Sequence, residues 1–157
     1  MCGRTRYEID AALVDELARD ARTTNAELAA RTGIAASTAH ARVRALESRG
    51  IVRGYHAGVD QTSLGRGLQA MIGVTLRPGS RQESITAFAE AVRHLPQVMQ
   101  TFFVGGVDDF LVHVAVADSS ELRSIVVEHL SAQPSVASTR TSVIFAYHRG
   151  AVVAPFD

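Results

Sequence analysis

The feature that most constrains the fold is a helix start signal followed, after a glycine, by a second helical pattern. Thr24 and Glu27 have the spacing of a capping box, which opens a helix, and Gly33 is the residue type that commonly ends one in the left-handed conformation. The apolar residues beyond it recur at i, i+4 and i+7 and predict a second helix with one apolar face. They are Ala39, Val43 and Leu46. Two short helices joined by a glycine-bearing turn predict a helix-turn-helix over residues 24–48.

The segments on either side extend this motif. Apolar residues at helical spacing, among them Leu13 and Leu17, predict a helix over residues 8–20. The segment IVRGYHAGVD, residues 51–60, alternates around two glycines and predicts two short strands, the wing of a winged helix-turn-helix. We therefore expect residues 1–60 to form one DNA-binding domain.

The charge of the chain is zero overall but uneven along its length. Residues 8–30 hold two arginines and six acids, whereas residues 31–54 hold five arginines and one acid. On the second helix of the motif, small and hydroxyl residues would let the helix approach a DNA groove, and arginines would reach phosphates or guanine. A solvated helix face would carry similar charges, but the turn and the wing favour DNA. The predicted DNA-binding residues are Ser37, Thr38, His40, Ala41, Arg42, Arg44 and Arg49.

Loss of an arginine from this helix is expected to affect binding alone. Arg42→Ala or Arg44→Ala should weaken DNA binding without unfolding the chain, since both side chains are placed on the outward face.

The rest of the chain has a different pattern. Residues 61–67, QTSLGRG, are polar and predict a linker, and residues 68–157 predict a second domain. Strand and helix periodicities alternate in the order βαββαβ, which is that of a ferredoxin-like α+β sandwich. Ser119 or Ser120 is expected to open the second helix. The predicted elements are strand 68–77, helix 82–95, strand 96–106, strand 109–117, helix 119–133 and strand 134–148.

The sheet of this domain needs a cover on both faces. Two helices cover one face, and several apolar strand residues are assigned to the other, where a second subunit is the simplest cover. These residues are Phe102, Val104, Val112, Val114 and Ile144.

The order of these parts resembles the Lrp/AsnC family of transcription regulators along nearly the whole chain. Residues 9–60 have the family's D-x-R, capping-box and LA-x-x-x-G elements, followed by R-V-x-x-L-E-x-x-G-I-V-x-G-Y from residue 42. GVDDFLVHV, residues 106–114, is similar to the family's turn between the second and third strands. Ala35 and Ala36 stand where serine and proline are usual and should weaken the helix start by about 1 kcal/mol. Asp108 stands where an aromatic residue is more usual.

The resemblance implies a transcription regulator in two parts. The N-terminal winged helix-turn-helix would bind double-stranded DNA. The C-terminal ferredoxin-like domain, of the RAM type, would form homodimers that assemble to tetramers or octamers. The same domain would bind a small effector, commonly an amino acid.

A glycine-rich turn with two carboxylates is the candidate effector site. A carboxylate could bind the ammonium group of an amino acid, and the backbone N–H groups of the glycines could bind its carboxylate. Threonine hydroxyls on the last strand could add contacts. A polar hairpin turn with ordinary strand threonines is the alternative interpretation. The candidate residues are Gly105, Gly106, Val107, Asp108, Asp109, Thr139 and Thr141.

Other classes of function fit less well. An enzyme would have to use Asp108, Asp109 and His113, which form no nucleophile–base pair, so no catalytic residue is expected. The histidines are scattered, which argues against a metal site, and no cofactor is expected. No apolar run approaches the roughly 18 residues of a transmembrane helix, and no export signal is seen, so we expect a cytoplasmic protein. An architectural protein that oligomerises on DNA without an effector remains an alternative.

Overall fold

The computed structural model describes residues 5–79 and 81–147, which divide into two compact units along the chain. The first includes the residues up to Gly58, and the second is Val59–Tyr147. None of the described helices is long and apolar enough to cross a membrane. The end of the predicted C-terminal domain, residues 148–157, lies outside the described residues.

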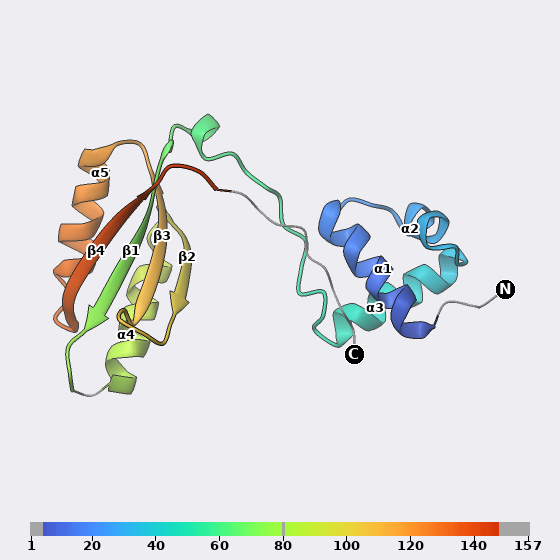
Figure 1. Ribbon diagram of the computed structural model, residues 1–157, viewed down its shortest axis with the longest axis horizontal. Coiled ribbons are helices and arrows are strands. Elements are labelled where there is room, and N and C mark those ends of the chain that lie inside the picture. Colours follow the sequence, from blue (N-terminus) through green and yellow to red (C-terminus); the bar gives the residue numbers. More distant parts are fainter. Residues whose placement is uncertain (1–4, 80, 148–157) are drawn as a thin grey trace. The chain divides into compact units, whose positions relative to one another are not determined.

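Three helices form the N-terminal unit, and their order confirms the predicted helix-turn-helix (Figure 1). Thr24 and Glu27 form the predicted capping box, and Gly33 ends its helix with a φ of 74°. The apolar face predicted from Ala39 to Leu46 is buried in a core shared by all three helices. The helices are α1 (Arg6–Arg19), α2 (Asn25–Thr32) and α3 (Ala36–Ser48).

The two short strands predicted for the wing are not formed. Residues 53–60 lie outside helices and strands. Gly54 has a φ of 155°, a positive value that residues with a side chain rarely adopt. A hairpin requires two paired strands, and residues 53–60 form none in the structure.

The C-terminal unit has the predicted βαββαβ order. Its antiparallel sheet has the strand order β2-β3-β1-β4. Asp118, rather than Ser119 or Ser120, caps α5, because its carboxylate accepts two backbone N–H groups. The elements are β1 (Leu68–Leu76), α4 (Arg81–Arg93), β2 (Val98–Phe103), β3 (Phe110–Val116), α5 (Ser119–Ser124) with a π-helical continuation (Ile125–Ser131), and β4 (Val136–Ile144), preceded by a short 3₁₀ turn (Thr62–Leu64).

Both helices pack on one face of the sheet, which is the helix-covered face. Alternate residues of β1 and β3 point into this core, and Phe88 of α4 packs against Phe110 with ring centroids 4.7 Å apart. Val112 and Val114 belong to this core, so their assignment to the opposite face was wrong. They have the parity of Phe110 along β3, and strand parity decides the face.

The opposite, uncovered face carries the other half of each strand. Phe102 pairs with Leu111 there, and Ile144 pairs with Gln69. Phe102 keeps 44% of its surface exposed. Phe102 and Ile144 therefore lie on the face to which they were assigned, whereas the second subunit expected to cover that face stays a prediction.

Candidate functional sites

The outward face of α3 presents most of the predicted DNA-binding residues. Ser37, Thr38, His40, Ala41 and Arg44 are all exposed. No ion pair joins Arg44 to another described residue, so its charge is available to a ligand. As expected from its methyl side chain, the N-cap residue of α3, an alanine, makes no capping hydrogen bond. The face therefore combines hydroxyls, an imidazole, a small residue and one uncompensated guanidinium.

His40 is held in place by the preceding helix. Its Nδ1 lies 3.1 Å from the Nδ2 of Asn25, the first residue of α2. The contact leaves Nε2 as the ring nitrogen farther from α2. Because the Asn25 amide nitrogen can only donate, Nδ1 accepts and the ring proton lies on Nε2, which can donate to a base edge.

Arg42 and Arg49, both predicted to contact DNA, instead pair with a carboxylate of their own chain. Arg42 Nη1 lies 2.9 Å from Asp10 Oδ1, and Arg49 Nη1 lies 3.5 Å from Asp10 Oδ2. Arg42 is also the less exposed of the two, with 23% of its side chain accessible against 48% for Arg49. Their shared partner, Asp10, lies 32 residues or more away in the sequence and could not be identified from local spacing.

Asp10 is the residue that sequence reasoning missed. It lies on the buried face of α1 with Leu13 and Leu17, and is only 5% exposed. Its spacing of three and seven residues from these leucines was a usable signal, since a carboxylate on an apolar helix face requires a cation or hydrogen-bond donors.

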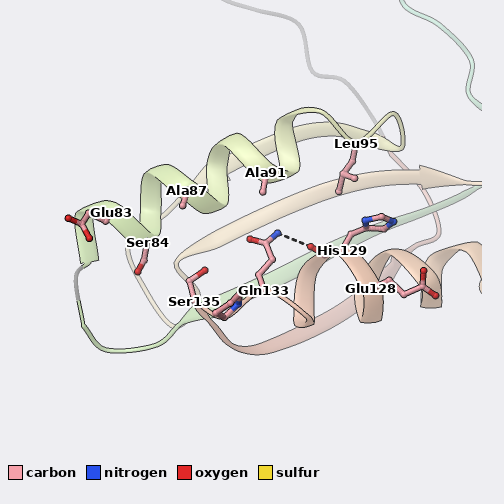
Figure 2. A pocket seen from close by; sticks show the side chains of 10 residues that line it. Glu83, Ser84, Ala87, Ala91, Leu95, Glu128, His129, Gln133 and Ser135 are labelled. Carbon is pink, nitrogen blue, oxygen red and sulfur yellow. Dashed lines mark hydrogen bonds between the residues drawn. The ribbon is translucent and has the colours of Figure 1, made fainter.

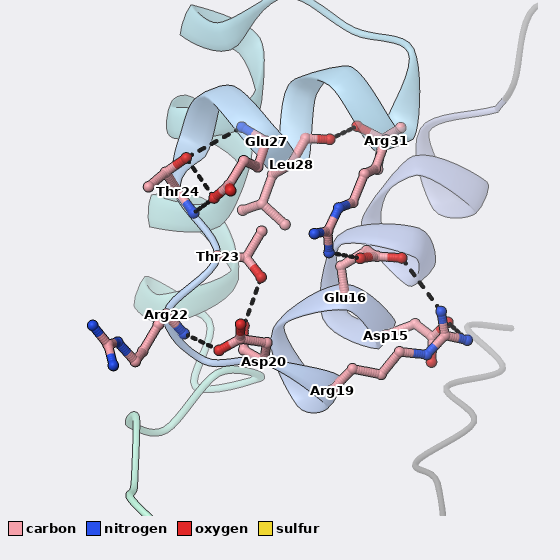
Figure 3. Close-up of polar contacts among 11 residues, drawn as sticks. Asp15, Glu16, Arg19, Asp20, Arg22, Thr23, Thr24, Glu27, Leu28 and Arg31 are labelled. Carbon is pink, nitrogen blue, oxygen red and sulfur yellow. Dashed lines mark hydrogen bonds and ion pairs between the residues drawn. The ribbon is translucent and has the colours of Figure 1, made fainter.

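Other charges of the N-terminal unit are paired between α1 and α2 (Figure 3). Arg31 Nη1 donates to Glu16 Oε2 at 2.6 Å, and Glu16 raises the pKa of Arg31. Asp20 Oδ1 accepts the backbone N–H of Arg22 at 2.9 Å, so these two residues form a turn rather than a side-chain ion pair. In Figure 3 the Arg22 guanidinium points away from Asp20. The basic surplus seen in the sequence is therefore partly neutralised within the fold.

In the candidate effector region, Asp109 has a structural position. It is 8% exposed, and its Oδ2 accepts the backbone N–H of Leu76 at 2.7 Å. Its own N–H donates to Val74 O at 2.9 Å. These bonds fasten the turn between β2 and β3 to the central strand β1.

Asp108 lies on the uncovered face of the sheet and pairs with Arg140. Arg140 Nη2 lies 2.6 Å from Asp108 Oδ2. The carboxylate sits over Gly73, where a Cβ atom would come within 2.6 Å of Oδ2. A side chain at this position of β1 would therefore require the Asp108 carboxylate to shift. Arg140 was not among the predicted effector residues. Because strand side chains alternate, its position between Thr139 and Thr141 places it on the face opposite to that of the two threonines.

The structure does not bring all the predicted effector residues together. Thr139 pairs with Val74 and Thr141 with Ile72, whose side chains lie on the helix-covered face. The Thr139 hydroxyl accordingly lies 3.1 Å from the Ser131 hydroxyl of the π-helical turn. The two threonines thus share one face, as expected, but it is not the face that carries Asp108.

The glycine-rich turn itself is open to solvent. Gly105 and Gly106 are exposed, Gly106 has a φ of 157°, and Val107 is 80% exposed. The backbone N–H groups of this turn can be approached by a ligand from outside. His113 lies nearby in sequence on β3, where burial lowers its pKa and its Nε2 lies 3.0 Å from Gln69 Oε1. No group of described residues could hold a metal ion.

A groove of about 590 Å³ lies between α4 and the π-helical continuation of α5, Ile125–Ser131 (Figure 2). It contains none of the predicted site residues. Its lining is Glu83, Ser84, Ala87, Ala91, Leu95, Glu128, His129, Gln133, Pro134 and Ser135. The Gln133 amide donates to the backbone oxygen of His129 at 2.7 Å and so stays within its own helix end.

Both units match family models. The model described as Lrp/AsnC ligand binding domain matches residues 69–148, and a model described as winged helix-turn-helix DNA-binding matches residues 8–53. The HTH-type transcriptional regulator AldR of Mycolicibacterium smegmatis is 46% identical over 92% of this chain and 84% of its own length. The leucine-responsive regulatory protein of Rhizobium meliloti is 37% identical over 85% of each protein.

Solved structures agree with these matches. A transcriptional regulator from Neisseria meningitidis, in complex with L-methionine, is similar with a TM-score of 0.87 and 28% identity over 96% of this chain and 97% of that one. The crystal structure of MtbAldR is similar with a TM-score of 0.78 and 38% identity over 94% and 96% of the two chains.

Proposed function

This chain belongs to the Lrp/AsnC family of transcription regulators, and from that premise we propose that it regulates transcription in response to an amino acid. The observation that carries the DNA-binding half is the exposed face of α3, where Arg44 forms no ion pair with residues 5–79 or 81–147. The other exposed residues of this face are Ser37, Thr38, His40 and Ala41. Their side chains are small enough for the helix to enter a major groove.

The effector half rests on the C-terminal unit. A relative whose name is leucine-responsive and a similar structure solved with L-methionine support a free amino acid as the ligand class. A zwitterion needs an anion for its ammonium group and donors for its carboxylate. Asp108 is the candidate for the first role, and the exposed backbone around Gly105 and Gly106 is the candidate for the second.

We propose further that the chain forms a homo-oligomer through the uncovered face of the sheet. Phe102 is 44% exposed there, and Leu111 and Met71 lie on the same face. Apolar side chains gathered on a sheet face are characteristic of an interface. A sheet that packs on its own copy would cover both copies at once.

If the Arg44 guanidinium contacts a base, Arg44→Ala is expected to weaken binding to duplex DNA by about 1–3 kcal/mol. If it contacts a phosphate, the salt slope, which is the slope of log affinity against log salt concentration, is expected to fall in magnitude by about one. Fluorescence anisotropy at several salt concentrations measures both quantities. Arg93→Ala, at an exposed arginine of α4, is the matched control and should bind as the parent does. Equal affinity of the Arg44→Ala variant and the parent would contradict the assignment of α3 to the groove.

A thermal-shift scan against the twenty amino acids tests the effector. A ligand at 100 times its Kd should stabilise the native state by about 2.7 kcal/mol, which raises Tm measurably. We expect one or a few amino acids to do so, and Asp108→Asn to reduce the shift. If none of the twenty shifts Tm, the amino-acid response is wrong, and an oligomeric DNA-binding protein without such an effector becomes the better description.

A further inference from the structure

We propose that Asp10 determines the DNA specificity of this protein by holding Arg42 and Arg49 away from the phosphate backbone. The proposal rests on the proposed function, because it assumes that α3 is the helix that contacts DNA. Asp10 would not touch DNA itself. It acts as a positioning residue through the two arginines it binds.

The two arginines that Asp10 binds lie in the middle of α3 and at its C-cap. Each carboxylate oxygen binds a different arginine, Oδ1 at 2.9 Å from Arg42 and Oδ2 at 3.5 Å from Arg49. The arginines are seven residues apart, which is about two helical turns, so they project from the same side of the helix. One carboxylate on α1 therefore joins two points on the same side of α3, in addition to the apolar core that Ala39, Val43 and Leu46 share with α1 and α2.

The burial of the carboxylate makes this arrangement hard to break. Asp10 keeps only 7% of its side-chain surface exposed, and an ionised carboxylate without a partner is unfavourable at such a site. Arg42 Nε is itself buried and has no hydrogen-bond partner among the described residues, as expected if the charge of Asp10 draws the side chain inward. Moving Arg42 onto a phosphate would leave Asp10 with the longer, more exposed Arg49 contact alone.

The cluster of Asp10, Arg42 and Arg49 affects sequence-independent and sequence-specific DNA affinity in opposite ways. Binding that ignores sequence grows with the number of phosphates that arginines neutralise. Binding that reads sequence depends on the pose of α3, which sets where its exposed residues meet the bases. By holding two arginines and fixing the helix, Asp10 lowers the first affinity and raises the second.

Asp10→Asn tests this proposal, because it keeps the shape of the side chain and removes its charge. The probes are a duplex selected by the parent protein from a random pool and a duplex of equal length with the same bases shuffled. We expect affinity for the shuffled duplex to rise and its salt slope to steepen by up to about two, at about 0.9 per released arginine. Affinity for the selected duplex is expected to fall, so the ratio of the two affinities drops.

Asp15→Asn is the matched control. It changes the net charge by the same amount on the same helix, but Asp15 is 34% exposed and pairs with Arg19 rather than with α3. This variant should raise the affinity for both duplexes equally and leave their ratio unchanged. A fall in the ratio as large as that of Asp10→Asn would mean that net charge alone is responsible and would overturn the proposal.

If Asp10→Asn lost affinity equally for the selected and the shuffled duplex, the proposal would also be overturned, because an equal loss indicates a structural role only. If circular dichroism shows that Asp10→Asn is unfolded, Asp10→Leu replaces it, since leucine suits the apolar face shared with Leu13 and Leu17. Arg44→Ala separates the two proposals. Unchanged binding in Arg44→Ala contradicts the proposed DNA interface, whereas weakened binding there with an unchanged ratio in Asp10→Asn contradicts only the role of Asp10.

Discussion

Replacing Arg42 with alanine is expected to lower the free energy of unfolding of the N-terminal unit by about 3 kcal/mol. The change leaves the buried carboxylate of Asp10 with only the 3.5 Å contact to Arg49. Removing one partner of a buried ion pair lowers the free energy of unfolding much more than replacing both partners, because the remaining charge is left without compensation. This expectation replaces the earlier one, in which Arg42→Ala would affect DNA binding alone.

Arg31→Ala is the matched control for this effect. Both arginines pair with a carboxylate of α1, and the Arg31–Glu16 contact is the shorter, at 2.6 Å against 2.9 Å. Arg31 is however 51% exposed, and exposed ion pairs contribute little to stability because solvent screens them. Burial, not distance, therefore decides which variant is unstable. Urea unfolding with hydrogen exchange at α1 and α3 measures the difference, and equal stabilities would contradict the structural role of Arg42.

Asp109→Ala is expected to destabilise the C-terminal unit by about 2–3 kcal/mol. The carboxylate accepts the Leu76 N–H at 2.7 Å in a buried position, and its removal leaves that donor without its partner. Hydrogen bonds to a charged group are stronger than neutral ones, and an unsatisfied buried N–H adds its own penalty. Of the two bonds that attach the turn between β2 and β3 to β1, only the backbone bond from the Asp109 N–H to Val74 O would remain.

The neighbouring carboxylate provides the contrast. Asp108→Ala removes a pair whose other member, Arg140, is 64% exposed, so stability should change by no more than about 1 kcal/mol. Thermal unfolding of the two variants, with and without the amino acid that stabilises the parent, separates their roles. We expect Asp109→Ala to lose stability and Asp108→Ala to lose the ligand-dependent shift. Equal loss of stability in both would show that the two carboxylates are not distinct in function.

The order of elements could be predicted because its signals are local. The capping box of Thr24 and Glu27 and the left-handed Gly33 involve residues a few positions apart, and helix and strand periods need no knowledge of distant residues. The two strands of the wing were the exception, although the winged helix-turn-helix family model matches residues 8–53. Alternation around Gly54 was consistent with two strands, but a strand also requires a partner, and the described segment has none.

The candidate sites depended on contacts that no local pattern contains. Asp10 and Arg42 are 32 residues apart, as are Asp108 and Arg140, and each pair forms only when separate elements pack together. The sequence by itself therefore determined which helices and strands form, in what order, and which family they match. Only the tertiary structure decided which arginines pair with carboxylates of their own chain and on which face of the sheet Asp108 lies. The physical reason is that charge pairing and burial depend on distances through space, whereas the rules for helices, caps and turns depend on spacing along the chain.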